Sequence, residues 1–295
     1  MKKTLSVLLI LCLALGILAS CSAKEADYTL SIGVAVVGDT EGTSVSVTTA
    51  AVVLDADGKV VLCRLDANEL AAAAENGAVI SAVTEKSKYE KGDAYGMVAY
   101  GDAKAEWFKQ AEFFEEYVVG KTADEIANIK TGDAELVAGC TIDVADFVLA
   151  ITNAIKLERK VSFTSTADMT LGVALTGKVA DASGNAEYTF DTAATVMVDG
   201  KVVAAIADCA ESTLMMTEYA FDYKGTKLEL GDSYGMVAYG DASAEWYTQA
   251  QTFADTAVGK TADEVAELPV ENVAGCTMSV HALQAILARA AKNVR

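Results

Sequence analysis

The sequence is poor in histidine and in basic residues. It contains one histidine among 295 residues, which excludes a metal site built from several histidines. A Ser-His-Asp triad needs only one histidine, but we expect no nucleophile elbow of the G-x-S-x-G type to present the serine. We therefore interpret His281 as a solvated helix residue, and we expect neither a metal site nor a catalytic triad.

The shortage of basic residues leaves the chain strongly acidic. Lys and Arg together number 23 against 42 Asp and Glu, which gives a net charge of −19. Loss of Lys2 and Lys3 with the N-terminal segment described next changes this charge from −19 to −21. A surface of this sign repels the phosphates of nucleic acid, so we expect no nucleic-acid partner.

The N-terminus has the features of a secretory signal. Lys2 and Lys3 precede an apolar run, residues 5–18, that is too short to span a bilayer comfortably. The letters LASC at 18–21 resemble a bacterial lipobox, whose cysteine receives lipid and becomes the new N-terminus. We expect residues 1–20 to be a lipoprotein signal peptide. Cys21 would then anchor the protein on the extracytoplasmic face of the cell membrane.

Once Cys21 is assigned to lipid, the exported part of the chain retains Cys63, Cys140, Cys209 and Cys276. An exported protein can form disulfides. When the two halves described next are aligned, Cys63 and Cys209 fall four positions apart, which corresponds to roughly 13 Å along a strand. Bridged cysteines need Cα atoms within about 7 Å. One bridge in one half therefore remains open, but two equivalent bridges are not expected.

An internal duplication organises the rest of the chain. The letters YGMVAYGDA occur at 95–103 and again at 234–242, and 24 of 35 positions are identical when 92–126 is aligned with 231–265. After a three-residue deletion, ELVAGCT at 135–141 aligns with ENVAGCT at 271–277. We expect two homologous domains, repeat 1 at 28–156 and repeat 2 at 167–292, joined by a linker at 157–166. Each would have its own core of about 125 residues.

Each repeat begins with a segment rich in β-forming residues and continues with segments that have helical periodicity. The Asp-Gly pairs at 57–58 and 199–200 predict hairpin turns. We expect YGMVAYG to be a further strand and Asp102 and Asp241 to cap the helices that follow. The fold class is thus α+β, with an antiparallel sheet and packed helices in each repeat.

The helical text carries recognisable start and stop signals. Trp107, Ala111, Phe114 and Val118 lie at helical spacing, and Gly120 ends that helix. Capping boxes follow in both repeats, Thr122 with Glu125 and Thr261 with Glu264. The letters GKT at 120–122 and 259–261 are not a phosphate loop, because the required upstream glycine is Glu115 or Ala254. Much of the repeated text can therefore serve the fold alone.

A Gly-Cys-Thr stretch precedes the last helix of each repeat. The backbone N–H groups at a helix start can bind phosphate, and a glycine there allows close approach of a ligand. We expect Thr141 or Asp143 to begin the helix of repeat 1. The stretch comprises Gly139, Cys140 and Thr141 in repeat 1 and Gly275, Cys276 and Thr277 in repeat 2.

On this stretch and on the order of its elements, the chain resembles secreted FMN-binding domains of bacterial lipoproteins and ion-pumping redox complexes. That family carries an acidic-x-x-[ST]-G-A-[ST] motif, whose last residue holds FMN through a phosphoester in many members. Thr141 and Thr277 match that acceptor, but the chain has Ala138 and Ala274 in place of the motif's first Ser or Thr. We therefore expect FMN without a covalent bond, or none. The resemblance implies a flavin ring against aromatic side chains: Tyr95, Tyr100, Trp107, Tyr234, Tyr239 and Trp246.

Two functions remain open on these grounds. The first is a membrane-anchored extracytoplasmic carrier of flavin or electrons, which would meet redox partner proteins. The alternative is a cell-surface binding or structural lipoprotein that keeps the fold without the flavin. No catalytic constellation is visible, so we expect a carrier or binding protein rather than an enzyme.

The anchor can be tested directly. We expect Cys21→Ala to release the protein into the medium or to leave the precursor unprocessed, because no other residue can take the lipid at that cleavage site. Membrane fractionation and the intact mass of the product measure both effects. A variant that stays on membranes at the wild-type level, with normal processing, would show that Cys21 is not the anchor.

Overall fold

The computed structural model describes residues 25–39, 43–75, 78–218 and 220–295. The expected signal peptide and Cys21 lie outside the described residues. Within the described part of the chain, no helix is long and apolar enough to cross a membrane.

Repeat 1 opens with three long strands, continues with three short ones, and ends in helices. The strands are β1 (Ala26–Gly38), β2 (Ser44–Leu54), β3 (Val60–Ala71), β4 (Ala73–Glu75), β5 (Ala78–Ile80) and β6 (Ala82–Thr84). The helices are α1 (Lys88–Lys91), the 3-10 turn η1 (Gly92–Tyr95), α2 (Met97–Tyr100), α3 (Trp107–Tyr117), α4 (Ala123–Ala127) and α5 (Ala145–Lys156).

Repeat 2 follows the same order with longer strands. It is preceded by β7 (Val161–Ser165), which lies in the segment between the repeats. Its own strands are β8 (Thr170–Ala182), β9 (Asn185–Val198), β10 (Lys201–Met215) and β11 (Ala220–Thr226). Its helices are α6 (Lys227–Leu230), the 3-10 turn η2 (Gly231–Tyr234), α7 (Met236–Gly240), α8 (Trp246–Asp255), α9 (Ala262–Ala266) and α10 (His281–Lys292).

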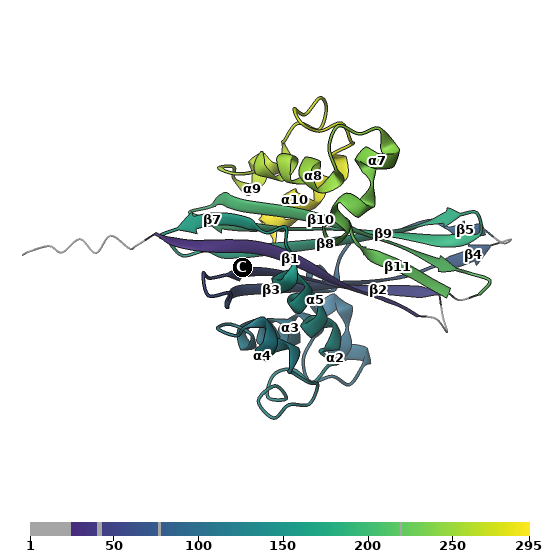
Figure 1. Cartoon of the computed structure of the whole chain (residues 1–295). Helices are drawn as coiled ribbons and strands as arrows, with labels where there is room; N and C mark the ends of the chain where they lie inside the picture. Colours follow the sequence, from purple (N-terminus) through teal and green to yellow (C-terminus); the bar gives the residue numbers. More distant parts are fainter. Residues whose placement is uncertain (1–24, 40–42, 76–77, 219) are drawn as a thin grey trace, which may run out of the picture.

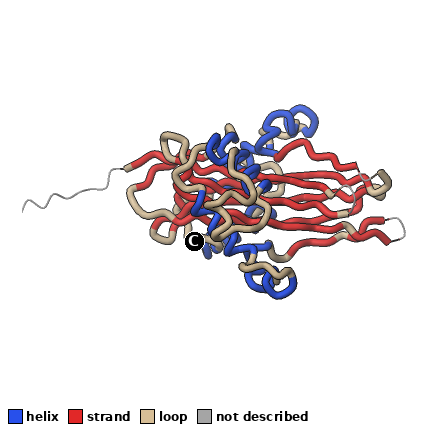
Figure 2. The backbone as a smooth tube through the Cα atoms, turned by 90° about the horizontal axis from the view of Figure 1, so that it is seen from below, coloured by secondary structure: helices blue, strands red, loops and turns tan. Residues whose placement is uncertain are grey.

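The molecule has four layers: helices, sheet, sheet, helices (Figure 1). One sheet has the strand order β3-β2-β1-β7 and the other β11-β10-β9-β8-β6, and all their pairings are antiparallel. Helices of repeat 1 lie across the outer face of the first sheet when it is seen from below (Figure 2). The α+β class with two antiparallel sheets and packed helices is confirmed.

Both faces of each sheet are buried, which explains the unbroken apolar text of the strands. In β2, Ala50 and Val52 pack beneath the helices of repeat 1, while the alternate residues Ala51 and Val53 pack against repeat 2. A strand has side chains on two faces, so a strand between two apolar layers needs apolar residues at both parities. On the outer faces the closest helix contacts require glycine. A Cβ at Gly33 would lie 2.2 Å from the Ala154 nitrogen.

The two repeats share a core between their sheets, while the cluster beneath the helices of repeat 1 belongs to that repeat alone. Leu30, Ile32 and Val53 of repeat 1 belong to the same buried cluster as Leu171 and Val173 of repeat 2. Between the sheets, the buried hydroxyls of Thr49 and Thr192 lie 2.9 Å apart. A fragment holding 167–295 alone would expose the inner face of its sheet to water.

Strands also cross the repeat boundary. The segment 157–166, expected as a linker, contains β7, which pairs with β1 of repeat 1, and Leu157 in it is buried. In the other direction β6 of repeat 1 pairs with β8 of repeat 2. Edge strands leave unpaired backbone groups, and each sheet covers one edge with a strand from the other side of the boundary.

The prediction of a strand at 95–101 is wrong. The segment forms η1 and then α2, separated by Gly96 at φ +82°. The carboxylate of Glu106 accepts hydrogen bonds from the backbone of Met97 and Val98 at 2.9 and 3.0 Å. This buried charge satisfies the free N–H groups at the start of α2, an interaction that periodicity within seven residues cannot reveal.

The caps expected at Asp102 and Asp241 are also wrong. Both residues have a φ of 52°, and the following helices begin later, after Glu106 and Glu245. Other local predictions are confirmed. The Asp-Gly hairpin turns form, both capping boxes form, and Gly120 follows the end of α3 at φ +81°.

All four described cysteines are free thiols, so the disulfide left open for one half does not form. Cys63 is buried below the helices of repeat 1, and Cys209 is buried on repeat 2. Burial raises the pKa of both thiols well above the usual value. They pack as small apolar residues.

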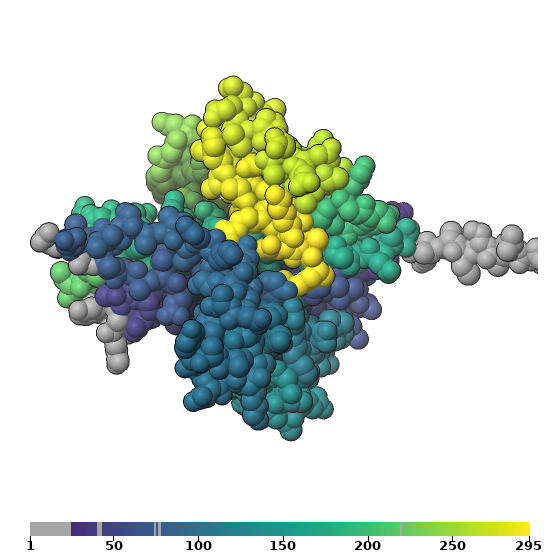
Figure 3. Space-filling view, turned by 180° about the vertical axis from the view of Figure 1, so that it is seen from behind, coloured from purple at the N-terminus to yellow at the C-terminus, as the bar shows by residue number. Residues whose placement is uncertain are grey.

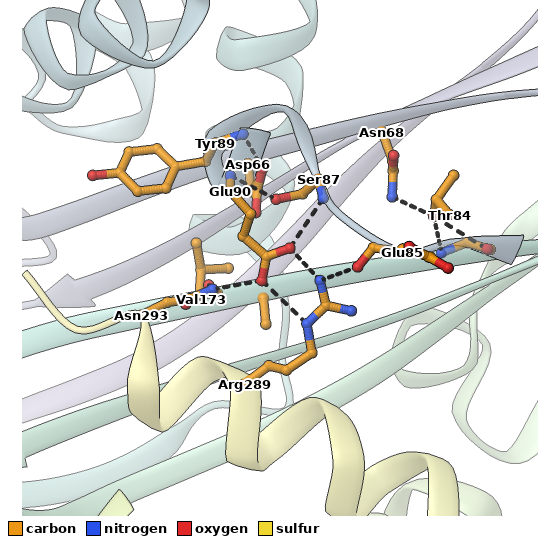
Figure 4. A network of polar contacts seen from close by, with 12 residues as sticks. Asp66, Asn68, Thr84, Glu85, Ser87, Tyr89, Glu90, Val173, Arg289 and Asn293 are labelled. Atoms are coloured by element: carbon orange, nitrogen blue, oxygen red, sulfur yellow. Dashed lines mark hydrogen bonds and ion pairs between the residues drawn. The ribbon is translucent and has the colours of Figure 1, made fainter. Parts of the chain in front are cut away.

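A polar network ties α1 to the end of α10 (Figure 4). The Glu90 carboxylate accepts from Arg289 Nε at 3.1 Å and from Asn293 Nδ2 at 3.1 Å. It also accepts from the Ser87 backbone at 3.0 Å, which completes the capping box of α1. One carboxylate thus starts a helix of repeat 1 and holds the last helix of repeat 2.

The C-terminal residue extends this connection. Its side chain lies over the ring of Tyr89 at 3.5 Å and contacts the buried Glu115 carboxylate at 2.5 Å. Arg64 contacts the same carboxylate at 3.4 Å. From behind, the C-terminal residues lie against the residues of repeat 1 (Figure 3). Removing Arg295 would leave the buried Glu115 carboxylate with Arg64 and the backbone N–H of Leu65, which donates to it at 2.7 Å. Loss of one partner of a buried ion pair typically costs about 3–5 kcal/mol.

Two further buried carboxylates occupy equivalent places in the repeats. Asp66 Oδ1 accepts from the backbone of Ala67 at 2.8 Å and of Tyr89 at 3.2 Å, at the start of α1. Asp208 Oδ1 accepts from the backbone of Cys209 at 2.8 Å and of Leu228 at 3.0 Å, at the start of α6. Burial raises the pKa of each carboxyl to about 7, against these hydrogen bonds.

This pair predicts a pH dependence of stability. A carboxyl with a raised pKa in the folded state stabilises the fold below the unfolded pKa of about 4, and this stability is lost as pH rises through about 7. We expect the melting temperature of the wild type to fall between pH 4.5 and pH 8. Asp66→Asn and Asp208→Asn keep an oxygen acceptor but carry no charge, so each should reduce this slope.

The control is Asp57→Asn in the exposed hairpin turn, which should leave the slope unchanged. Equal pH slopes for Asp66→Asn, Asp208→Asn and the wild type would contradict the assignment.

Candidate functional site

The Gly-Cys-Thr stretch of repeat 1 is held by a buried glutamine. Gln110, on α3, is 1% exposed. Its Oε1 accepts from the backbone of Thr141 at 2.8 Å and of Ile142 at 3.2 Å, and lies 3.2 Å from the Thr141 hydroxyl. Its Nε2 donates to the Ala105 carbonyl at 2.9 Å. The glutamine amide therefore uses the backbone N–H groups that we expected to bind phosphate.

Repeat 2 has the same arrangement. Gln249 is fully buried, and its Oε1 accepts from the backbone of Thr277 at 2.7 Å and of Met278 at 3.1 Å. Its Nε2 donates to the Ala244 carbonyl at 2.7 Å. The repeated letters E-W-x-x-Q therefore have the same structural role in both repeats. The Glu carboxylate accepts from the N–H groups at the start of a short helix, and the Gln amide holds the loop before the last helix.

The last helices begin later than expected. Helix α5 starts at Ala145, and neither Thr141 nor Asp143 is its N-cap residue, which is Val144. The Asp143 carboxylate does accept from the Ala145 backbone at 2.9 Å and from the Thr131 hydroxyl at 2.8 Å. These hydrogen bonds lower the pKa of Asp143. A negative charge therefore already occupies the start of α5.

The cysteines of the two stretches are packing residues. Cys140 is 1% exposed, and burial raises the pKa of its thiol to about 11. Cys276 is partly exposed, and its thiol donates to the Gln249 carbonyl at 3.3 Å. Gly139 is needed because a Cβ there would lie 2.1 Å from the Phe113 ring. Gly275 has a φ of +83°.

Four of the six aromatic side chains expected at a flavin divide into two groups. Trp107 and Trp246 are 5% and 7% exposed and belong to the cores below the helices. Tyr100 and Tyr239 are 92% and 91% exposed and lie on the outside of α2 and α7. The structure therefore does not bring Tyr100 to Trp107, nor Tyr239 to Trp246.

A pocket of ≈ 280 Å³ opens between the first sheet and the helices of repeat 1. Trp107 and Phe147 form one wall, with their rings edge to face at 5.6 Å. The pocket adjoins the loop that follows Thr141. Its lining also includes Ser46, Thr48, Ala67, Lys88, Tyr95, Met97, Ile142, Asp143 and Asp146. Of the expected flavin contacts, it contains Tyr95 and Trp107.

Sequence reasoning missed the two charged side chains that distinguish this pocket. Lys88 lies on α1, and Asp146 lies in the first turn of α5. A signal for Lys88 existed, because the repeat alignment places Lys227 at the same position directly after a capping Ser or Thr. Asp146 aligns with Ala282, so the repeat gave no signal for it.

In repeat 2 the equivalent lysine fills its own aromatic surroundings. Lys227 Nζ lies 2.7 Å from Glu211 and 4.8 and 5.5 Å from the rings of Tyr234 and Trp246. In repeat 1 Lys88 Nζ lies 4.0 Å from Glu69 and 5.2 Å from the ring of Tyr95. The two repeats therefore share a lysine beside aromatic rings but use it differently.

The letters of a nucleophile elbow do occur, at 231–235 (GDSYG), contrary to our expectation. The structure places them in η2, directly after α6 rather than after a strand, and Ser233 is exposed. His281 contacts Ser279 at 3.2 Å and Glu271 at 3.4 Å instead. The described residues contain no group of three or more His, Cys, Asp or Glu side chains arranged to hold a metal.

Comparison with known proteins gives little. No protein-family model matches the sequence, and no solved structure matches it. Among curated proteins, a chlorophenol reductase of Desulfitobacterium hafniense is 33% identical over 97 residues. The match covers 28% of this chain and 30% of the relative, so the chain spans less than a third of that protein's length.

Neither the Gly-Cys-Thr stretches nor the pocket of repeat 1 matches the full size and charge of FMN. The phosphate does not fit the Gly-Cys-Thr stretches as they stand, because Gln110 and Gln249 hold the N–H groups and Asp143 holds the helix start. The pocket of ≈ 280 Å³ is also smaller than the ~300–1,000 Å³ typical for drug-sized ligands. Its walls do suit a flat apolar group.

This mismatch predicts the outcome of flavin attachment. Co-expressed with a flavin transferase, the wild type should gain no FMN mass. Ala138→Ser with Cys140→Ala rebuilds the attachment motif in repeat 1. This variant should gain one FMN mass if the family resemblance is sound and the Gln110 amide gives up the N–H groups that it holds. Adding Thr141→Ala should abolish that gain. Intact-mass spectrometry and visible absorbance measure both.

A wild type that gains one or two FMN masses, lost in Thr141→Ala or Thr277→Ala, would overturn the argument from Gln110 and Gln249.

Proposed function

We propose that the protein is an exported, lipid-anchored binding protein that takes a small ligand into the pocket of repeat 1. One observation carries the proposal: the pocket beside Trp107 combines an aromatic wall with charged side chains of both signs. Such a mixture of apolar walls and a few polar groups is typical of small-molecule sites. The lipid that we expect on Cys21, together with the acidic net charge, would suit a protein held at the extracytoplasmic face of the cell membrane.

In this proposal the repeats have different tasks. Repeat 2 covers the inner face of the sheet that carries the pocket, and its last helix fixes α1 through Glu90 and Arg289. Lys88 lies two residues before Glu90 on that short helix. Repeat 2 therefore helps to position a residue that lines the pocket.

The second candidate is a non-covalent flavin carrier that exchanges electrons with redox partner proteins. It is favoured by the meeting of Tyr95, Met97 and Trp107 in the same pocket, next to the loop after Thr141. The partial similarity to a protein named as a reductase points the same way. Flavin would supply the redox chemistry when bound, and Tyr95, Met97 and Trp107 would contact its ring.

The proposal of a small-molecule binding protein can be tested by blocking the pocket with a larger side chain. The chain has two tryptophans, so Trp246→Phe leaves Trp107 as the only one. In that background, compounds from a fragment library, with FMN and riboflavin among them, should change Trp107 fluorescence. Ala67→Leu puts a larger side chain at the pocket wall and should lower the affinity for these ligands at least about tenfold. Thermal melting checks that the variant is folded.

Ligands that bind equally well with and without Ala67→Leu would contradict a site in this pocket. Binding by flavins alone would favour the second candidate.

A further inference from the structure

In repeat 2, the aromatic rings of Tyr234 and Trp246 surround the ammonium group of a lysine from the same repeat. The side chain of Lys227 is 12% exposed. Its ammonium contacts the Glu211 carboxylate and lies over the rings of Tyr234 and Trp246. Aromatic faces attract a cation within about 6 Å, most strongly where water is excluded. In repeat 2 the lysine itself is therefore the occupant.

In repeat 1 the corresponding lysine is loosely held. Lys88 is 17% exposed, and its nearest carboxylate, Glu69, is 4.0 Å away and 54% exposed. Its ammonium also lies over the ring of Tyr95, 5.2 Å from the centroid. An ammonium group has three N–H donors, so Lys88 retains donors for an acidic group of a ligand.

Repeat 1 also has an acid that repeat 2 lacks. Asp146 lines the pocket from α5, where repeat 2 has Ala282, and Asp143 lines it where repeat 2 has Ser279. Burial raises the pKa of Asp146, as does the charge of Asp143, while Lys88 lowers it. Asp146 and Lys88 thus interact electrostatically in the pocket. A cationic group of a ligand would find a partly buried carboxylate there.

The remaining wall is apolar and the volume is small. Trp107 and Phe147, with Met97 and Ile142, suit a hydrocarbon side chain, and ≈ 280 Å³ suits a ligand below drug size. We infer that the pocket of repeat 1 binds a small zwitterion of the α-amino-acid type. Its carboxylate pairs with Lys88, its ammonium with Asp146, and its apolar side chain contacts Trp107 and Phe147. This inference rests on the proposed function.

The test uses the full exported chain with Trp246→Phe, so that fluorescence reports on Trp107. The probes are L-leucine, N-acetyl-L-leucine, which lacks the ammonium, and L-leucinamide, which lacks the carboxylate. Leucine should bind, and each blocked analogue should bind at least about tenfold more weakly, because each loses one charge-assisted hydrogen bond. Calorimetry with wild-type protein confirms the affinities.

Two variants assign the charges. Lys88→Met should remove the preference for leucine over leucinamide and keep the preference over N-acetyl-leucine. Asp146→Asn should do the reverse. The matched control is Lys227→Met in repeat 2, which should leave leucine binding unchanged. A merely structural role of Lys88 or Asp146 would weaken all three probes by the same factor, and that result would overturn the inference.

Failure of the inference differs from failure of the proposed function. If leucine, phenylalanine and valine all fail to bind while another compound binds and is excluded by Ala67→Leu, the zwitterion is wrong and the pocket stands. If leucine and both analogues bind equally well, the inference is wrong. If bound leucine is unaffected by Ala67→Leu, both are wrong, because the ligand then lies elsewhere.

Discussion

Contact between the two sheets is the constraint on which the rest of the structure depends. Each sheet is apolar on both faces, and the helices of its own repeat cover only one of them. The six side chains Leu30, Ile32, Val34, Leu171, Val173 and Leu175 are at most 2% exposed. Exposing each costs about 1.5–3 kcal/mol. The total cost of exposing all six is comparable to the ~5–15 kcal/mol by which a typical domain is stable.

The repeated sequence is largely accounted for by that architecture. Glu106 and Glu245 start the short helices α2 and α7, and Gln110 and Gln249 close the loops before the last helices. These are buried polar groups whose partners lie within the repeat, so loss of any one would leave unsatisfied backbone N–H groups. Packing does not account for Tyr100 and Tyr239, which are identical in the two repeats and almost fully exposed.

Duplication produced two similar outer faces, and a few side chains make them different. Lys227 occupies the aromatic surroundings of repeat 2, whereas in repeat 1 Lys88 stands away from its acid and a pocket is present. Asp146 in place of Ala282 adds a charge on one side only. The shared core makes the stability of each repeat depend on the other. Repeat 2 can therefore help to maintain the fold while repeat 1 carries the ligand site.

The sequence by itself determined the elements whose causes are local. The hairpin turns at 57–58 and 199–200, the two capping boxes and the apolar face of α3 depend on residues a few positions apart. The repeat also predicted the α+β class. In contrast, the segment 95–101 was misread, because the carboxylate that makes it a helix is Glu106, outside the segment.

Only the tertiary structure decided the features that join distant residues. It placed β7 beside β1 and β6 beside β8, brought Arg289 to Glu90, and set Gln110 against the loop at Thr141. Of the site, the sequence identified Tyr95 and Trp107 but neither Lys88 nor Asp146. The physical reason is that burial and charge pairing depend on which surfaces meet. An apolar strand face reads the same in sequence whether helices or a second sheet cover it.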